Sequence, residues 1–147
     1  MNDLSTGKPQ PVITDLTRPF WEAAREGRLV MQKCSRCGTM NFHPKPWCIE
    51  CGCRDLPWTA AGPLGTVYSF TVSRSVAMNS PVWQAELPVI LCLVDVDQGA
   101  RMYAQVIGCT PEQIHVGMRV TVHFDPADGE LAVPRFRPAA SPDATPT

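Results

Sequence analysis

Hydrophobic residues in this chain follow a helical period near the N-terminus and a strand-like period over the second half. Phe20, Ala23 and Ala24 fall on one face of a short predicted helix. Pro19 favours a helix start there, and Gly27 is placed to end the helix with a left-handed cap. A helix of so few turns is not stable alone, so we expect it to dock on another surface.

From Gly65 onward, runs of strand-forming residues are separated by turn residues. These runs predict five strands, at 67–73, 89–96, 102–107, 120–124 and 131–136. Between the third and fourth strands, Thr110 and Gln113 form a capping box with Pro111 at the first helical position, which predicts a short helix. Five strands with a helix in that place favour a closed barrel of the OB type, and therefore a mainly β protein.

Two Cys-x-x-Cys pairs lie between the predicted helix and the barrel, separated by ten residues. They comprise Cys34, Cys37, Cys48 and Cys51. Four thiolates at this spacing can close one tetrahedral site, and a glycine after each pair, Gly38 and Gly52, lets the chain turn tightly around the ion. We expect one structural Zn²⁺ in a zinc ribbon, built with a strand at 29–33 and an arm at 40–46. Iron in a rubredoxin-like site is the alternative that the ligand set leaves open.

Composition and charge narrow the class of protein. A hydrophobic fraction of 44% supports a packed core. The net charge of −1 lacks the basic excess that is typical of a dedicated nucleic-acid binder. Seven cysteines, an N-terminus unlike a signal peptide, and no segment approaching about 20 apolar residues predict a cytoplasmic protein without a membrane span.

The patterns divide the chain into four parts. They are an N-terminal tail and helix at 1–27, a zinc ribbon at 28–58, an OB-fold domain at 59–137 and a disordered tail at 138–147. Residues 56–65 contain two prolines and two glycines and are expected to be a linker. The segment 74–87 is too long for a tight hairpin and too apolar for simple disorder, so we expect a partner, an acyl group or the end of the barrel to cover it.

An ordered set of short motifs covers most of the chain. The set comprises Phe20-Trp21, Gly27-x-Leu29, Gln32-Lys33-Cys34-x-x-Cys37-Gly38, Phe42-His43-Pro44, Cys48-x-x-Cys51-Gly52, Trp58, Gly62-x-x-Gly65-Thr66-Val67-x-Ser69, Pro88, Asp97-x-Gly99, Gly117-Met118-x-Val120 and Val133-x-Arg135-Phe136-Arg137-Pro138. Together these motifs resemble the DUF35 family. The resemblance implies a rubredoxin-like zinc ribbon followed by a C-terminal OB-fold. It also implies a non-catalytic subunit that binds a thiolase-fold enzyme (a thiolase, aldolase or condensing synthase) or sits beside a hydratase, in lipid or aromatic-acid metabolism.

One departure from the family pattern is Cys53, where a small residue usually follows Gly52. It leaves open which thiolate of the second pair binds the metal. The register of the first pair favours Cys51.

The ribbon carries a local positive charge. Between Arg28 and Trp58, five basic residues stand against two acidic ones, which leaves +3. Such a patch could attract the phosphates of CoA, with an aromatic face for adenine. The candidate CoA-binding residues are Arg36, Lys45, Trp47 and Arg54. Solvation of a small module explains the basic residues equally well, and the resemblance is what favours a CoA ester as ligand.

Large apolar residues outside the predicted core are the candidates for a partner interface. They are Phe20, Trp21, Met78 and Trp83. No catalytic residue is assigned, because no nucleophile with a base, no carboxylate pair and no open metal site can be assembled from the sequence. The alternative functions are a single-stranded nucleic-acid-binding ribbon and OB module, and electron transfer through iron.

Overall fold

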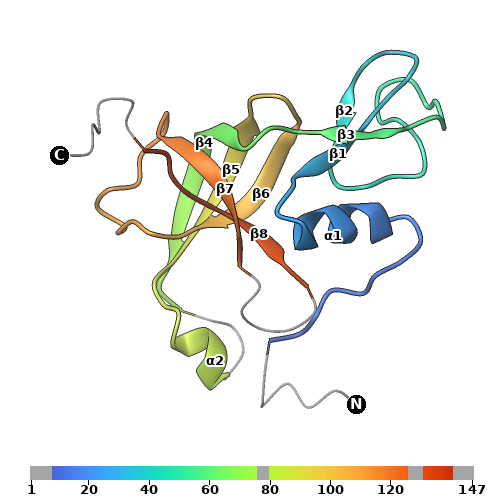
Figure 1. Cartoon of the computed structure of the whole chain (residues 1–147). Coiled ribbons are helices and arrows are strands. Elements are labelled where there is room, and N and C mark those ends of the chain that lie inside the picture. Colours follow the sequence, from blue (N-terminus) through green and yellow to red (C-terminus); the bar gives the residue numbers. More distant parts are fainter. Residues whose placement is uncertain (1–7, 76–79, 126–130, 141–147) are drawn as a thin grey trace.

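The computed structural model describes residues 8–75, 80–125 and 131–140 of the chain. Figure 1 shows a barrel on one side and, on the other, a small sheet with a helix beneath it. The elements are α1 (Arg18–Arg25), β1 (Val30–Lys33), β2 (Met40–Asn41), β3 (Trp58–Ala60), β4 (Leu64–Ser73), α2 (Pro81–Gln84), β5 (Val89–Val96), β6 (Arg101–Val106), β7 (Arg119–Asp125) and β8 (Val133–Pro138). The prediction of a mainly β protein is confirmed.

Helix α1 has the face and the end that the sequence predicts. Phe20, Ala23 and Ala24 are buried. Gly27 has a φ of 74°, and its N–H donates to the carbonyl of Ala24 at 3.0 Å while the N–H of Arg28 donates to that of Ala23 at 2.9 Å. These two bonds satisfy carbonyls that the helix end would leave unpaired. Figure 1 shows α1 beneath the small sheet and beside the barrel, which is the docking that so short a helix requires.

The small sheet has the order β2-β1-β3 and is antiparallel. Strand β3 lies inside residues 56–65, where the sequence predicted only a linker, and that prediction is wrong for these three residues. Met31 pairs with Thr59 in this register. Pro57 and Gly62 bracket the strand so closely that no alternating pattern is long enough to identify it. The ribbon therefore continues into the segment that leads to β4.

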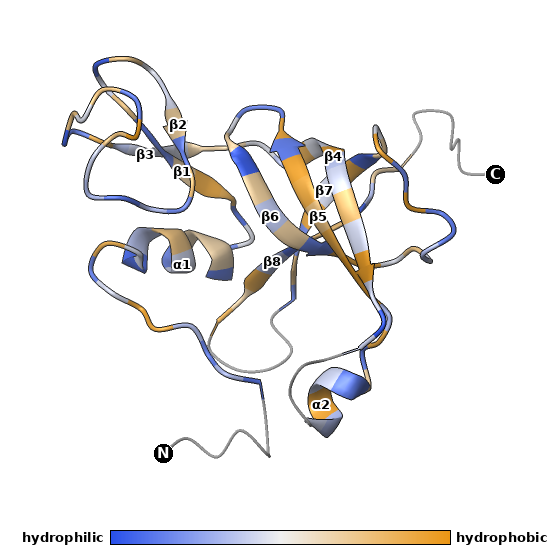
Figure 2. Ribbon diagram, turned by 180° about the vertical axis from the view of Figure 1, so that it is seen from behind, coloured by the Kyte–Doolittle hydropathy of each residue, from blue (hydrophilic) through white to orange (hydrophobic). Residues whose placement is uncertain are grey.

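The second half forms a closed barrel with the order β4-β5-β6-β8-β7, as predicted for an OB-fold. Strand β4 is longer than predicted, because its first residues pair with β7 as well as β5. On β5, every second residue from Ile90 to Val96 is buried. Figure 2 shows β5 as hydrophobic along most of its length. Its two faces differ only modestly in hydropathy, which is why the sequence shows a nearly continuous apolar run.

The predicted helix between the third and fourth barrel strands is a hydrogen-bonded turn, so that prediction is wrong. Gln113 Oε1 does accept the N–H of Thr110 at 2.8 Å, as a capping box requires. The N–H of Ile114 donates to the carbonyl of Thr110 at 3.2 Å. The chain then turns back to the barrel, where the N–H of Gly117 donates to the carbonyl of Val67 at 2.8 Å. Pairing with β4 thus limits this segment to a single hydrogen-bonded turn.

The small sheet and the barrel share one hydrophobic core. Met31 of β1 is fully buried, and its Sδ accepts the N–H of Ala100 at 3.1 Å. A Cβ at Gly99 would lie 2.9 Å from the same sulfur. The β5–β6 turn thus lies in close contact with the ribbon, and ribbon and barrel are packed as one unit.

Candidate metal centre and pocket

Four cysteine sulfurs come together in the ribbon. The Sγ atoms of Cys34, Cys37, Cys48 and Cys51 all lie within 4.8 Å of one another. The Sγ–Sγ distance is 3.5 Å for Cys34 and Cys51, and 3.6 Å for Cys37 and Cys48. Tetrahedral coordination with zinc–sulfur bonds of about 2.3 Å places sulfurs about 3.8 Å apart, so this donor set fits one Zn²⁺.

The two cysteine turns have the same backbone structure. The N–H of Gly38 donates to the carbonyl of Cys34 at 2.9 Å, and the N–H of Gly52 donates to that of Cys48 at 3.0 Å. Both glycines are left-handed, with φ of 74° and 72°. A side chain at either position would be strained, which explains the glycine that follows each pair.

Cys53 occupies the same place in the second turn as Thr39 in the first. The carbonyl of Thr39 accepts the N–H of Cys34 at 2.9 Å, and the carbonyl of Cys53 accepts the N–H of Cys48 at 2.8 Å. The Cys53 sulfur lies 3.9 Å from Ser35 Oγ. Among the described residues, the cluster of four sulfurs does not include Cys53, so the register that favoured Cys51 is the one found.

A buried asparagine holds the second cysteine turn against the first. Asn41 is 1% exposed, and its side-chain amide donates to the carbonyl of Thr39 at 3.1 Å and lies 3.9 Å from the sulfur of Cys48. Its Oδ1 accepts the N–H of Ile49 at 3.1 Å. The sequence reasoning did not identify Asn41. Asn41 lies on a strand of only two residues, which is too short to show a sequence pattern that would identify its role.

Thr39 also acts on a thiol of the cluster. Its hydroxyl lies 3.2 Å from the sulfur of Cys37. Hydrogen bonds from the hydroxyl and backbone of Thr39 lower the pKa of Cys37 to about 6. Because metals bind the thiolate, this contact favours the form that coordinates.

The four candidate CoA-binding residues lie on the ribbon. The side chains of Arg36 and Arg54 are exposed, and Trp47 is 52% exposed. Lys45 is held by its backbone, whose N–H and carbonyl bond the side-chain amide of Gln32 at 2.7 and 3.1 Å. None of the four candidates lines the pocket described next.

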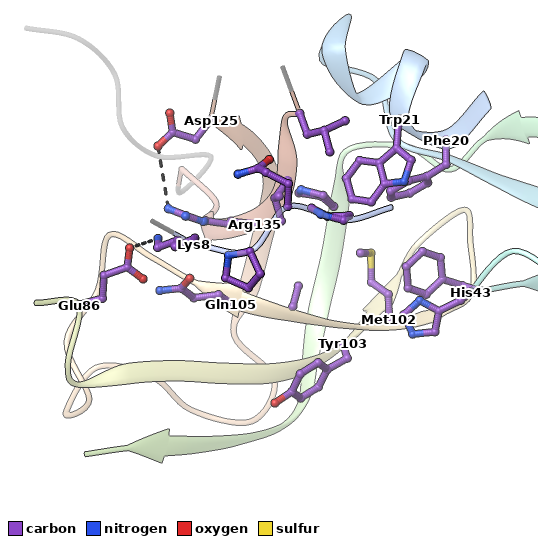
Figure 3. A pocket seen from close by; sticks show the side chains of 18 of the residues that line it. Lys8, Phe20, Trp21, His43, Glu86, Met102, Tyr103, Gln105, Asp125 and Arg135 are labelled. Atoms are coloured by element: carbon purple, nitrogen blue, oxygen red, sulfur yellow. Dashed lines mark hydrogen bonds and ion pairs between the residues drawn. The ribbon is translucent and has the colours of Figure 1, made fainter. Parts of the chain in front are cut away.

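A pocket of about 600 Å³ lies beside α1, and the sequence did not predict it. Its walls come from the N-terminal segment 8–11, α1, the arm after β2, α2 and the residues after it, β6, the end of β7, and β8. Figure 3 shows that the two ends of the pocket differ in polarity. The apolar end has Phe20, Trp21, His43 and Met102. The polar end has the ion pairs Lys8–Glu86 and Arg135–Asp125.

The candidate interface residues divide between the core and the pocket. Phe20 is 5% exposed and packs within the chain, so it offers little surface to a partner. Trp21 and Trp83 are half-buried and line the pocket, and Lys8 Nζ lies 5.2 Å from the ring of Trp83. Met78 lies outside the described residues. The N-terminal segment thus covers part of the surface that Trp83 would present.

Two thiols lie outside the ribbon. Burial raises the pKa of Cys92 to about 11 and also raises the pKa of Cys109. A thiol with a raised pKa is a weak nucleophile near neutral pH. No helix among the described residues is long and apolar enough to cross a membrane.

Domain models of a known protein family match the chain in two adjacent parts. The rubredoxin-like zinc ribbon domain of ChsH2 matches residues 21–57, and the C-terminal OB-fold domain of ChsH2 matches residues 58–125. The boundary between the matches lies just before β3.

Two curated relatives match the chain in sequence, and one solved structure matches it in fold. A probable enoyl-CoA hydratase alpha subunit of Thermomonospora curvata is 36% identical over 90% of this chain and 40% of its own length. The chain thus spans well under half of that relative. A DUF35 domain-containing scaffold protein of Pyrococcus furiosus is 30% identical over 78% of both chains. In a structure titled Ltp2-ChsH2(DUF35) aldolase, one chain is 34% identical, with a TM-score of 0.76, over 89% of this chain and 100% of that one.

Proposed function

The chain belongs to the DUF35 family of ChsH2-type proteins, and on that premise we propose that it is a non-catalytic accessory subunit of an acyl-CoA enzyme complex. The observation that carries the proposal is the likeness, over the whole of the other chain, to the DUF35 chain of an aldolase complex. The hydratase subunit among its relatives supports the same class of role. The partner we propose is a thiolase-fold enzyme of the thiolase, aldolase or condensing class.

The metal has a structural role in this proposal. Cys34, Cys37, Cys48 and Cys51 hold one Zn²⁺. With four thiolates the coordination shell is complete, so the ion cross-links the two cysteine turns and does not bind substrate. The raised pKa values of Cys92 and Cys109 support the assignment of the chemistry to the partner.

A CoA ester is the proposed ligand of the assembled complex. The guanidinium groups of Arg36 and Arg54 and the ammonium of Lys45 form no ion pair with any described residue, so they are available to phosphates. The exposed ring of Trp47 offers a face for adenine. Arg28, by contrast, is paired with Glu26 and adds little to this field.

The proposal is tested by purifying the tagged chain from its own cells and identifying the proteins that co-purify. We expect a thiolase-fold enzyme in stoichiometric amount, and weaker CoA-ester binding by the complex when Arg36 and Arg54 are both changed to Ser. The matched control is Arg18→Ser with Arg25→Ser on α1, which removes the same amount of charge outside the basic residues of the ribbon. A chain that runs as a monomer and captures no acyl-CoA enzyme would refute the proposed function.

A nucleic-acid module is the second candidate, and one surface of the barrel favours it. Tyr68 and Tyr103 are each about half exposed, and the guanidinium of Arg101 lies 3.4 Å from the ring centroid of Tyr68. Bases stack on such rings. Arg101 is, however, paired with Asp95, so the surface has little positive charge of its own. Tight, salt-sensitive binding of oligonucleotides in a filter assay, lost in Tyr103→Ala, would favour this candidate.

A further inference from the structure

We propose that the pocket beside α1 is a binding site for a neutral small molecule that combines an apolar ring system with one hydrogen-bond donor. A volume of about 600 Å³ is in the range of small-molecule sites. All the residues of this site belong to the chain itself. One source of such a ligand is the acyl part of a CoA ester, and only that identification rests on the proposed function.

The apolar end of the pocket is shaped for a flat group. Phe20 and Trp21 meet edge to face with ring centroids 5.0 Å apart, and Phe20 lies 5.8 Å from Phe42 in a tilted arrangement. The rings belong to α1 and to the arm after β2. Because they pack against one another, the orientation of this wall of the pocket is fixed. The thioether of Met102 completes this end and makes favourable contacts with aromatic rings. Aromatic walls in fixed orientation bind a planar ring best.

Among the described residues that line it, the polar end of the pocket is balanced in charge. Lys8 is paired with Glu86, and Arg135 is paired with Asp125 at 3.9 Å. Figure 3 shows both pairs at the end of the pocket opposite Phe20 and Trp21. Two cations beside two anions give no net field for an ionic ligand, so the pocket selects a neutral one.

One oxygen of Glu86 specifies the hydrogen-bonding group of the ligand. Oε1 accepts from Lys8, whereas Oε2 is buried and has no hydrogen-bond partner among the described residues. A buried acceptor without a donor is costly, and a bond to a charged acceptor is among the stronger hydrogen bonds. A ligand hydroxyl or amide N–H at this end would satisfy Oε2. A ligand with only acceptors there would not.

Two probes with the same ring system test the proposal: 4-phenylphenol, and 4-methoxybiphenyl, in which a methyl group replaces the proton of the hydroxyl. Calorimetry on the full chain should give saturable one-to-one binding of 4-phenylphenol. The methoxy compound should bind at least about tenfold more weakly, which is the smallest effect expected of one hydrogen bond to a charged group. The indole N–H signals of Trp21 and Trp83 should shift in NMR spectra, whereas that of Trp47, on the ribbon, should not.

Variants separate the two ends of the site. Val133→Trp fills the pocket from a half-exposed wall position and should weaken both probes at least tenfold. Glu86→Met keeps the length of the side chain but removes the acceptor, and it should abolish the difference between the probes. Glu50→Met, an exposed position on the ribbon, is the matched control and should bind like the unchanged chain.

The proposal is overturned if neither probe binds, if both bind equally, or if the Trp47 signal shifts as much as the other two. Should Glu86→Met fail to fold by circular dichroism, the comparison of the two probes on Val133→Trp and on the unchanged chain still decides. The test needs neither CoA nor a partner enzyme. Its outcome is therefore independent of whether the chain captures an acyl-CoA enzyme.

Discussion

Individual polar side chains hold the cysteine turns in place. Asn41 bonds the backbone of both turns from a buried position between them, at Thr39 on one side and Ile49 on the other. Gln32 ties β1 to the arm between the turns through both backbone groups of Lys45. Because these amides bond backbone on facing segments, they orient the sulfurs without touching the metal.

Replacing Asn41 by alanine is expected to weaken zinc binding about 10- to 100-fold, as for other residues that orient metal ligands. The second cysteine turn loses its bonds to the first, so the four sulfurs are held less well. Competition with a chromogenic chelator measures the effect. Glu50→Ala, in the same turn but exposed, should retain the affinity of the unchanged chain, and an equal loss there would show that Asn41 has no special role.

The spacing of the cysteines and glycines predicts the metal-binding turns, because these depend only on residues near one another in sequence. Asn41 and Gln32 could not be predicted in this way. Their partners lie eight and thirteen residues away, and the bonds exist only once the ribbon has folded. Local spacing gives the ligands, whereas the groups that orient them require the tertiary structure.

The pair of Asp97 and Arg119 makes stability depend on pH. Arg119 donates to both carboxylate oxygens, at 2.8 and 2.6 Å, and these hydrogen bonds lower the pKa of Asp97. A carboxyl with a lowered pKa in the folded state stabilises the fold above its unfolded value of about 3.9, and that contribution is lost as the pH falls through the folded pKa.

Asp97→Asn is therefore expected to lower the melting temperature at pH 7 and to have a smaller effect near pH 3. Thermal melts of both proteins at the two pH values measure the difference. Glu112→Gln, an exposed carboxyl on the same domain, should show no such pH-dependent difference. An effect of Asp97→Asn that is equal at both pH values would contradict the assigned role of the ion pair.

At the scale of elements, strand β4 closes the barrel by pairing with β5 and β7 at its first residues. Gly65 pairs with Val96 on one side and Val120 on the other. A Cβ there would lie 2.6 Å from a methyl group of Val94 and 2.9 Å from the carbonyl oxygen of Asp95. Because the contact with Asp95 involves a backbone atom, a side-chain movement cannot relieve it.

Gly65→Ala is expected to lower the free energy of unfolding by about 1–3 kcal/mol, because an added methyl group overpacks this crossing. Urea denaturation measures it. Ser69→Ala, exposed on the same strand, should change stability by no more than about 0.5 kcal/mol. A Gly65 variant as stable as the unchanged chain would mean that β4 can shift away from β5.

The sequence predicts α1 and the five barrel strands because each has a periodic pattern of its own. It does not predict β3, which is a strand only because β1 lies beside it, with Gln32 opposite Trp58. It wrongly predicts a helix after Thr110, where the local capping signal is present and pairing of Gly117 with Val67 overrides it. Both errors occur where long-range pairing decides over local preference.

For the whole molecule, Met31 joins the ribbon to the barrel. Its side chain is fully buried in the shared core, against Gly99 and the N–H of Ala100. The pocket also depends on this joint, since its walls come from the N-terminal segment, the ribbon and the barrel together. No local pattern could predict a cavity whose lining residues span more than 120 positions of the chain.

Met31→Ala is expected to lower the free energy of unfolding by about 2–5 kcal/mol, the usual cost of deleting a large core side chain. It should also uncouple the two domains. In the unchanged protein, removing zinc should reduce the hydrogen-exchange protection of β5 and β6, and in the variant it should not. The exposed Ile49→Ala is the control. Equal sensitivity to zinc removal in both proteins would show that the joint does not depend on Met31.

The cysteine cluster has a protected side and an open side. The sulfurs of Cys34 and Cys48 belong to residues that are almost fully buried, whereas Cys37 is exposed and Cys51 is partly so. Each turn thus contributes one inner and one outer ligand. Metal exchange should therefore be directional: a chelator or an alkylating agent reaches Cys37 first, and the ion leaves stepwise through the outer pair. The lifetime of the bound metal is then set by how well the outer thiolates are covered, and a partner enzyme docked over Cys37 would slow zinc loss from the ribbon.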